Sequence, residues 1–145
     1  MLYRQSRSGI EVLLVHPGGP FWKSRDEGGW TIPKGEFDDA EDPLVAAKRE
    51  FEEETGAAPP DGAYIPLTPI KQKNGKLVYA WAVEGDFDPS NLRSNNFSCE
   101  WPPKSGRMED FPEVDRAEWF AAEVAKQKMF SGQPALIDEL LRLRG

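Results

Sequence analysis

Residues 35–57 read GEFDDAEDPLVAAKREFEEETGA, and this stretch decides the expected fold. Asp42 followed by Pro43 is typical of a helix N-cap with proline at the first helical position. Gly56 supplies a natural helix end, because glycine readily adopts the left-handed conformation found just past helix C-termini. We therefore predict a helix that begins at Pro43 and ends before Gly56.

Three carboxylates gather on one side of this predicted helix. Glu50, Glu53 and Glu54 stand at positions i, i+3 and i+4, which lie on one helical face. An adjoining apolar stripe is expected to pack against a sheet and to leave the carboxylates at its margin. The stripe consists of Leu44, Ala47 and Phe51.

The carboxylates need a counter-charge. Like charges at this spacing destabilise a helix by about 0.2–0.5 kcal/mol per pair, and Lys48 and Arg49 are the only cations in the helix. A hard cation, Mg²⁺ or Mn²⁺, fits, because it accepts carboxylates, a backbone carbonyl and water. The alternative is that residues 52–54 form a solvated acidic face, which most charge runs are.

The spacing across residues 35–57 resembles the signature of the Nudix hydrolases at every defining position. That signature is Gly, five residues, Glu, seven residues, Arg-Glu, an apolar residue, any residue, Glu-Glu, any residue, Gly and an apolar residue. The last position is only Ala57, a mild departure. The flanking strands and residues 112–120 also look like the family, which extends the resemblance over most of the chain.

The resemblance implies an α/β fold, a Nudix-type α/β/α sandwich with a mixed sheet. It further implies that Arg49 forms an ion pair with a loop carboxylate, Glu41, and so acts as scaffold. The implied metal ligands are the backbone carbonyl of Gly35 and the carboxylates of Glu50, Glu53 and Glu54.

The implied reaction is water attack on phosphorus in a nucleoside diphosphate linked to another group. We name Glu53 as the general base, although members of the family differ in which glutamate takes the proton. We call the signature over residues 35–57 the box. Glu100, beside Trp101, is a candidate for an extra metal-binding carboxylate outside it. The alternative for Glu100 is an ordinary loop glutamate.

Substrate contacts are expected around the box. Lys34 directly precedes it and can meet a phosphate, and the run from Trp30 to Gly35 resembles the Nudix branch that hydrolyses diadenosine polyphosphates. Aromatic rings can stack on a base, and further cations can hold phosphates. The alternative for each ring is an ordinary core or rim residue, and for each cation a solvated surface residue. The rings are Phe21, Trp22 and Trp101, and the cations are Lys23, Lys104 and Arg107.

Three functions follow from these observations. The first is a hydrolase of a dinucleoside polyphosphate or a similar long polyphosphate nucleotide. The second is a pyrophosphatase of a damaged nucleoside triphosphate, ADP-ribose or a nucleotide sugar. The third is a Nudix-fold nucleotide sensor without turnover.

Length and composition limit the number of domains, the cellular compartment and the partners that we expect. The 145 residues suit one domain, 1–145, and the single cysteine, Cys99, suits a reducing cytoplasm. The formal charge of −7 argues against nucleic acid as the main partner. We find no signal segment and no apolar run of membrane-spanning length, and the oligomeric state stays open.

The other expected elements frame the box. Residues 2–5 and 10–16 read as a hairpin, with His16 a structural residue, and residues 68–73 and 76–83 read as a second hairpin around Asn74-Gly75. Residues 84–112 read as irregular, and residues 114–120 as a last strand. A C-terminal helix over about 133–143 carries an apolar stripe that packs in the core. That stripe consists of Leu136, Ile137, Leu140, Leu141 and Leu143.

Overall fold

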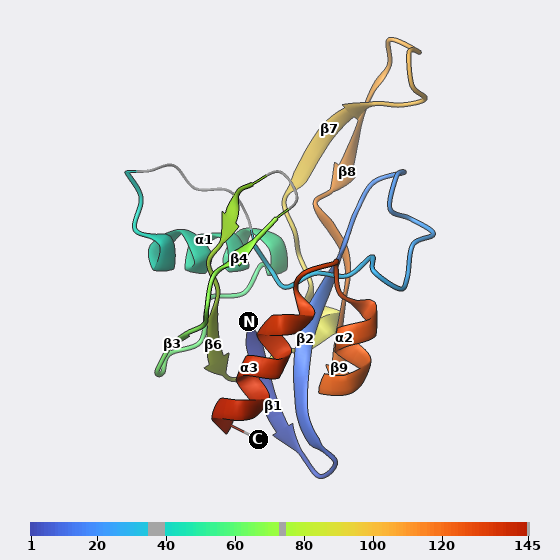
Figure 1. Ribbon diagram of the computed structural model, residues 1–145. Coiled ribbons are helices and arrows are strands. Elements are labelled where there is room, and N and C mark those ends of the chain that lie inside the picture. The colour runs from blue at the N-terminus through green and yellow to red at the C-terminus, as the bar shows by residue number, and fades with distance from the viewer. Residues whose placement is uncertain (35–39, 73–74, 145) are drawn as a thin grey trace.

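The computed structural model describes residues 1–34, 40–72 and 75–144 (Figure 1). Gly35 and Asn74, which carry two of the sequence predictions, lie outside the described residues. The described elements are, in chain order, β1 (Leu2–Ser6), β2 (Gly9–Pro17), α1 (Pro43–Thr55), β3 (Ile65–Pro66), β4 (Ile70–Lys71), β5 (Leu77–Val78), β6 (Trp81–Glu84), the 3₁₀ turn η1 (Pro89–Asn91), β7 (Asn96–Glu100), β8 (Met108–Pro112), β9 (Val114–Ala121), α2 (Ala122–Lys128) and α3 (Pro134–Arg144).

A five-stranded mixed sheet forms the centre of the molecule, in the order β3-β6-β1-β2-β9. Strands β1 and β6 run parallel, whereas the other neighbours in this sheet are antiparallel. The hairpin expected from residues 2–16 is β1 and β2. The predicted last strand is β9, which pairs with β2 along its length.

Both faces of this sheet are covered, as β2 illustrates. Successive side chains of a strand point to opposite faces. Val12 and Leu14 pack in a cluster with residues of α2 and α3, whereas Leu13 and Val15 pack in a second cluster with Phe51 of α1. Helix α1 thus lies on one face and α2 and α3 on the other (Figure 1), which confirms the expected α/β/α sandwich.

Helix α1 begins and ends where the sequence predicts. The Asp42 side chain accepts hydrogen bonds from the backbone N–H groups of Leu44 and Val45, at 2.8 and 3.4 Å. Gly56 has φ of 79°, and its N–H donates to the Glu52 carbonyl. A Cβ at Gly56 would lie 2.6 Å from the Arg93 carbonyl oxygen, so this glycine is needed for both conformation and close approach.

The prediction that residues 84–112 are irregular is wrong. Strands β7 and β8 form an antiparallel hairpin that projects from the body of the molecule (Figure 1). Phe97 and Phe111 pair across it with ring centroids 6.0 Å apart. In β7, Phe97 and Cys99 alternate with exposed polar residues, but β8 shows no such alternation, so only one short strand of the hairpin carries the pattern that marks a half-buried strand.

The strand expected over residues 76–83 is divided in the structure. Its first part, β5, pairs with β4 in a separate two-stranded ribbon, and its second part, β6, enters the main sheet. Ala80 lies between them and is buried. The sequence also gave no expectation of α2. In the C-terminal helix Leu136, Ile137 and Leu140 are fully buried, but Leu143 is 49% exposed, so it does not belong to the core stripe.

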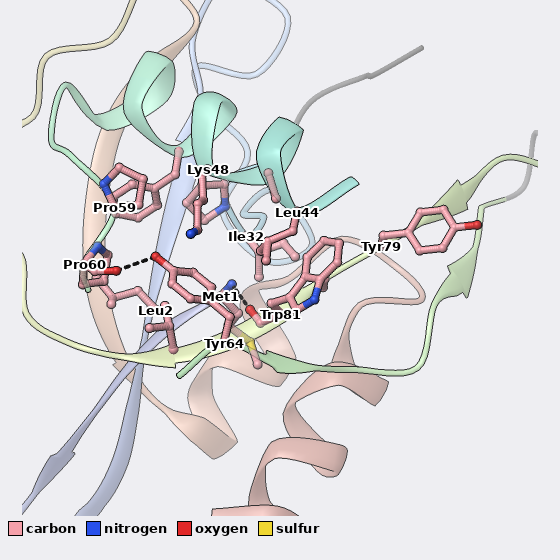
Figure 2. A pocket seen from close by; sticks show the side chains of 15 residues that line it. Met1, Leu2, Ile32, Leu44, Lys48, Pro59, Pro60, Tyr64, Tyr79 and Trp81 are labelled. Atoms are coloured by element: carbon pink, nitrogen blue, oxygen red, sulfur yellow. Dashed lines mark hydrogen bonds between the residues drawn. The ribbon is translucent and has the colours of Figure 1, made fainter. Parts of the chain in front are cut away.

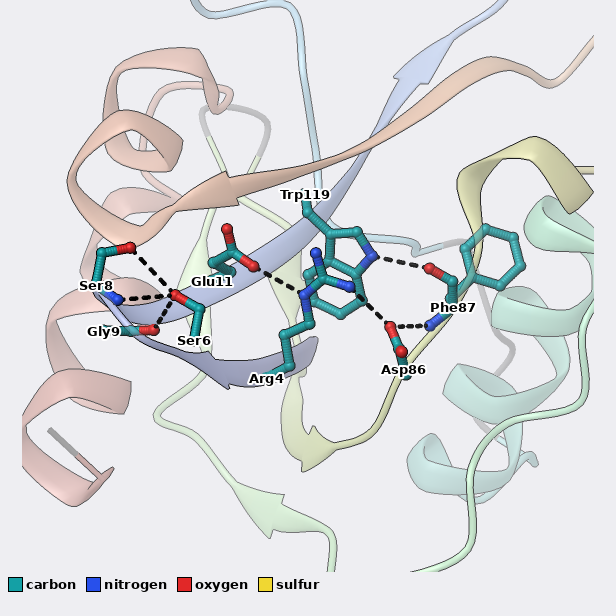
Figure 3. A network of polar contacts seen from close by, with 8 residues as sticks. All are labelled: Arg4, Ser6, Ser8, Gly9, Glu11, Asp86, Phe87 and Trp119. Carbon is teal, nitrogen blue, oxygen red and sulfur yellow. Dashed lines mark hydrogen bonds and ion pairs between the residues drawn. The ribbon is translucent and has the colours of Figure 1, made fainter.

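A polar network ties neighbouring strands together (Figure 3). Arg4 donates to Glu11 and Asp86, at 2.8 and 2.9 Å, and its guanidinium lies 4.1 Å from the ring centroid of Trp119. The indole N–H of Trp119 donates to the Phe87 carbonyl. These contacts join β1, β2 and β9 to the chain that follows β6. Within the described residues, no helix has the length and apolar character to cross a membrane.

Candidate metal and phosphate site

Arg49 is the counter-ion within the turn of α1 that carries Glu50, Glu53 and Glu54, which we call the acidic turn. Its guanidinium contacts the carboxylate of Glu41 in the preceding loop and donates to Glu50 at 3.0 Å. Its Nε also lies 3.7 Å from a carboxylate oxygen of Glu53. The predicted pairing with Glu41 is present, and the same cation also offsets part of the repulsion among the helix glutamates.

Glu54 is the most sheltered of these carboxylates. Its Oε2 is buried and has no hydrogen-bond partner among the residues that the structure describes, while the carboxylate accepts a hydrogen bond from the backbone N–H of Lys34. Burial, and then the charges of Glu50 and Glu113, raise the pKa of Glu54 to about 8. A buried acceptor left without a partner is costly, so this oxygen is suited to a cation.

Glu113 is a neighbour of the acidic turn that sequence reasoning did not assign. Its N–H donates to the Asn95 carbonyl at 2.7 Å, and the Asn95 N–H donates to the Glu53 carbonyl at 2.9 Å. Partial burial, and the charges of Glu50 and Glu53, raise the pKa of Glu113. Its place directly before the last strand was visible in the sequence, but nothing there indicated that this strand starts beside α1.

The donors fit a divalent cation in chemistry. All are carboxylate oxygens, which Mg²⁺ and Mn²⁺ prefer, and Glu54 holds one buried oxygen without a partner. Among the described residues no three acidic, histidine or cysteine side chains are grouped closely enough to enclose an ion. Since Arg49 engages Glu50 and approaches Glu53, these carboxylates must turn from it to share a cation with Glu54.

Glu100 does not lie with these carboxylates. It stands opposite Met108 in the hairpin, and its carboxylate accepts a hydrogen bond from the Lys104 N–H at 2.6 Å. Met108 is five residues before Glu113, a separation of about 16 Å in extended chain. The structure thus brings Glu113, and not the predicted Glu100, to the acidic turn, and Glu100 braces the hairpin turn.

The loop of residues 18–22 runs along the β7–β8 hairpin and reaches its end. A Cβ on Gly18 would overlap the Pro112 carbonyl oxygen, and a Cβ on Gly19 would lie 2.9 Å from the ring of Phe97. Further along, Phe21 meets Trp101 edge to face, with centroids 5.5 Å apart. We call residues 18–22 and 96–112 the arm. The arm extends from beside Glu113 and ends in a pair of rings.

The predicted substrate cations Lys104 and Arg107 both lie in the turn at the end of the arm. Lys104 has φ of 62°, and the Arg107 carbonyl accepts a hydrogen bond from the Trp101 N–H at 2.9 Å. Both side chains are exposed. Their place near Trp101 separates them from Lys34, which lies at Glu54.

Trp22 and His16 are held by protein neighbours. The Trp22 ring stacks on Phe130 with centroids 5.1 Å apart, and the Arg25 guanidinium lies 5.1 Å from its centroid. His16 is fully buried, with Nδ1 2.9 Å from the Asp115 carboxylate and Nε2 2.6 Å from the Arg25 carbonyl. Both ring nitrogens are satisfied, which confirms the structural role expected for His16.

Two curated proteins resemble part of this chain. An RNA pyrophosphohydrolase from Caulobacter vibrioides is 42% identical over 94 residues, which cover 61% of this chain and 51% of that protein. An 8-oxo-(d)GTP phosphatase from Mycolicibacterium smegmatis is 40% identical over 87 residues, 57% of this chain and 24% of that protein. The matched segments thus span about half of the first protein's length and about a quarter of the second's.

Solved structures share the fold over nearly the whole chain. A C. elegans Ap4A hydrolase in a binary complex superposes with a TM-score of 0.66 at 20% identity, covering 98% of this chain and 92% of that one. The NUDIX domain of Shewanella oneidensis NrtR, complexed with ADP ribose, gives a TM-score of 0.63 at 16% identity, covering 99% and 84%. The family model for the NUDIX domain matches residues 2–140. With the box helix, its caps and the sandwich in place, the chain belongs to the NUDIX family.

Proposed function

We propose that this protein is a Mg²⁺- or Mn²⁺-dependent pyrophosphohydrolase that cleaves a phosphoanhydride bond in a long polyphosphate nucleotide, most directly a dinucleoside polyphosphate. The observation that carries the proposal is the buried, unpartnered Oε2 of Glu54 beside Glu50 and Glu113. Membership of the NUDIX family supports the reaction class. The lone cysteine favours a cytoplasmic setting.

The glutamates of the site divide two roles in this proposal, metal binding and proton transfer. Glu50, Glu53 and Glu54 hold the cation, together with the carbonyl that the family resemblance implies for Gly35. When bound, such a cation withdraws charge from bridging phosphates and lowers the pKa of a bound water. Glu53 stays our candidate for the general base, and Glu113 is an additional carboxylate on the same side.

Two cations beside the acidic turn do different work. Arg49 positions α1 against the preceding loop through its ion pair with Glu41. Lys34 instead adjoins Glu54, whose carboxylate accepts a hydrogen bond from the Lys34 backbone N–H. The charge of Lys34 acts on Glu54, which supports our proposal that its ammonium meets a phosphate. Catalysis of phosphoryl transfer consists mostly of such positioning and charge stabilisation.

The length of the arm is an argument for a long substrate. It reaches about 16 Å from Glu113 and ends in Phe21 and Trp101, with Lys104 and Arg107 in the turn. Aromatic rings stack on bases with little sequence demand. A nucleotide with a second nucleoside beyond its polyphosphate would reach these rings, whereas a nucleoside triphosphate has no second base to place there.

A second candidate substrate is 5′-triphosphorylated RNA. The relative from Caulobacter vibrioides, 42% identical over the matched segment, is an RNA pyrophosphohydrolase, and the arm would then stack a following base. The net charge of −7 opposes extended binding to the RNA backbone. We therefore place the dinucleoside polyphosphate first.

A substrate panel with Mg²⁺ tests these choices. Diadenosine tetraphosphate, ATP, ADP-ribose and 5′-triphosphorylated RNA are compared by kcat/KM, with products separated by chromatography. We expect diadenosine tetraphosphate to be cleaved most efficiently. If RNA loses pyrophosphate with a higher kcat/KM, the second candidate replaces the first, and tight binding of one member without cleavage of any would make the protein a sensor.

Variants of the arm sharpen the test. Trp101→Ala should lower kcat/KM about tenfold for diadenosine tetraphosphate, since stacking on one base contributes about 1–3 kcal/mol, and should leave ATP hydrolysis unchanged. Leu143→Ala is the control, because it removes an exposed apolar side chain that lies on α3, outside the arm. Equal losses for both substrates would mean that the arm does not read the second nucleoside.

A further inference from the structure

A pocket opens between α1 and the sheet, away from the arm. It is a cleft open to solvent rather than an enclosed cavity, and its empty space of about 470 Å³ includes part of that solvent. Leu44, Ala47, Lys48 and Phe51 form its helical wall; they stand at i, i+3, i+4 and i+7, one face of the helix. The stripe predicted to pack against the sheet does face it, with Phe51 in contact with the core, and the cleft lies between this stripe and the sheet.

The opposite wall is aromatic. Trp81 begins β6, Tyr64 precedes β3, and both are partly exposed in the pocket. Tyr64 is held in place because its hydroxyl donates to the Pro60 carbonyl at 2.6 Å. Figure 2 shows Tyr64 and Trp81 lining the same space, beneath the helix that carries Leu44. These walls suit a planar ring.

Among the described residues, Lys48 is the one charged side chain that lines the pocket. Its ammonium lies 4.4 Å from the ring centroid of Tyr64 (Figure 2). In the part of the chain that the structure describes, it makes no ion pair. A ligand that covered this cation would remove water from it, which is unfavourable unless the ligand supplies a negative charge. The pocket thus selects an anion with an apolar, planar part.

The pocket is distinct from the acidic turn but shares its supports. Lys48 and Glu53 are five residues apart, which places them about 140° apart around the helix axis. Pro33 lines the pocket, and the next residue, Lys34, donates its N–H to Glu54. A ligand here would therefore contact helix α1 and the segment at Pro33 that adjoins Glu54, without touching the carboxylates of the acidic turn.

We propose that this pocket is a second ligand site, which binds a nucleoside monophosphate with the base against the aromatic wall of Tyr64 and Trp81 and the phosphate on Lys48. The choice of phosphate rests on the proposed function, because hydrolysis of a dinucleoside polyphosphate releases such a product. Nucleoside monophosphate is also the smallest nucleotide that carries both the ring and the anion.

Binding of AMP in EDTA tests this site without cations at the acidic turn. Titration calorimetry should give saturable binding to the parent protein and a dissociation constant at least tenfold weaker for Lys48→Gln. Lys71→Gln, which removes an exposed lysine on β4, should bind like the parent, and so should Glu53→Gln. Adenosine and inorganic phosphate, each offering half of the ligand, should bind more weakly than AMP.

A second readout guards against a folding defect in the lysine variant. AMP should change tryptophan fluorescence in the parent, and Trp81→Phe should lose that change while keeping the parent's circular dichroism spectrum. Absence of saturable binding, unchanged affinity in Lys48→Gln, or loss of binding in Glu53→Gln would each overturn the proposal. Because none of these titrations requires turnover, a protein inactive on every polyphosphate can still bind AMP at Lys48, which separates the two proposals.

Discussion

Glu54 is the residue on which the chemistry of the site depends most. Its pKa is raised to about 8 by burial and by neighbouring carboxylates, well above the usual value for glutamate. The folded, metal-free protein therefore holds a proton that the unfolded chain has released at neutral pH. Stability should fall as the pH rises from about 4.5, the value of the unfolded group, to about 8.

Thermal unfolding in EDTA at several pH values measures this effect. Glu54→Gln keeps the shape and removes the titration, so its unfolding temperature should fall less than the parent's between pH 5 and pH 8. Glu52→Gln is the control, because Glu52 lies on the same turn but is exposed. If the unfolding temperature of Glu54→Gln falls as much as the parent's across this range, Glu54 does not carry the raised pKa.

Arg49 should matter for both stability and activity. Arg49→Ala removes its contacts with Glu41 and Glu50 and leaves the helix glutamates without their internal counter-ion. We expect a lower unfolding temperature and a lower kcat/KM, with partial recovery in Arg49→Lys, which restores the charge but not the fork of donors. Parent-like melting of the alanine variant would remove the scaffold role.

At the scale of elements, the end of α1 makes a sharp prediction. Gly56 and Gly28 both have positive φ, 79° and 70°, but only at Gly56 would a Cβ meet backbone, the Arg93 carbonyl. Gly28→Ala should therefore cost about 1 kcal/mol for the left-handed conformation alone, and Gly56→Ala clearly more. Urea denaturation measures both, and equal losses would show that the contact with residue 93 adds nothing.

The elements also explain which sequence predictions succeeded. Helix α1 was predictable because its caps are local: Asp42 and Gly56 act on neighbouring residues. The β7–β8 hairpin was not, because its strands carry few apolar positions and are supported by the loop at Gly18 and Gly19. That support joins segments far apart in the sequence.

At the scale of the whole molecule, the sheet order determines what reaches the site. The box glutamates were predictable from spacing alone, whereas Glu113 comes to them only because β9 pairs with β2 and starts beside α1. Glu100, which the sequence analysis named as a candidate for an extra carboxylate, instead lies in the hairpin opposite Met108. Long-range pairing of this kind leaves no local signal.

The whole fold also separates two binding regions that the sequence did not distinguish. The arm and the acidic turn lie around Glu113, whereas the pocket at Lys48 lies between α1 and the opposite edge of the sheet. We continue to propose that residues 1–145 act as one domain, since the two hydrophobic clusters share the strands of one sheet.

The most direct test of the central claim is the hydrolysis of diadenosine tetraphosphate with Mg²⁺ by the parent, Glu54→Gln and Glu52→Gln. Outer partners of metal ligands alone typically contribute about 10–100-fold to activity, so loss of a ligand should reduce kcat/KM by about a hundredfold or more. We predict that loss for Glu54→Gln and parent-like rates for Glu52→Gln. A folded Glu54→Gln protein that hydrolyses the substrate at the parent's rate would contradict the account.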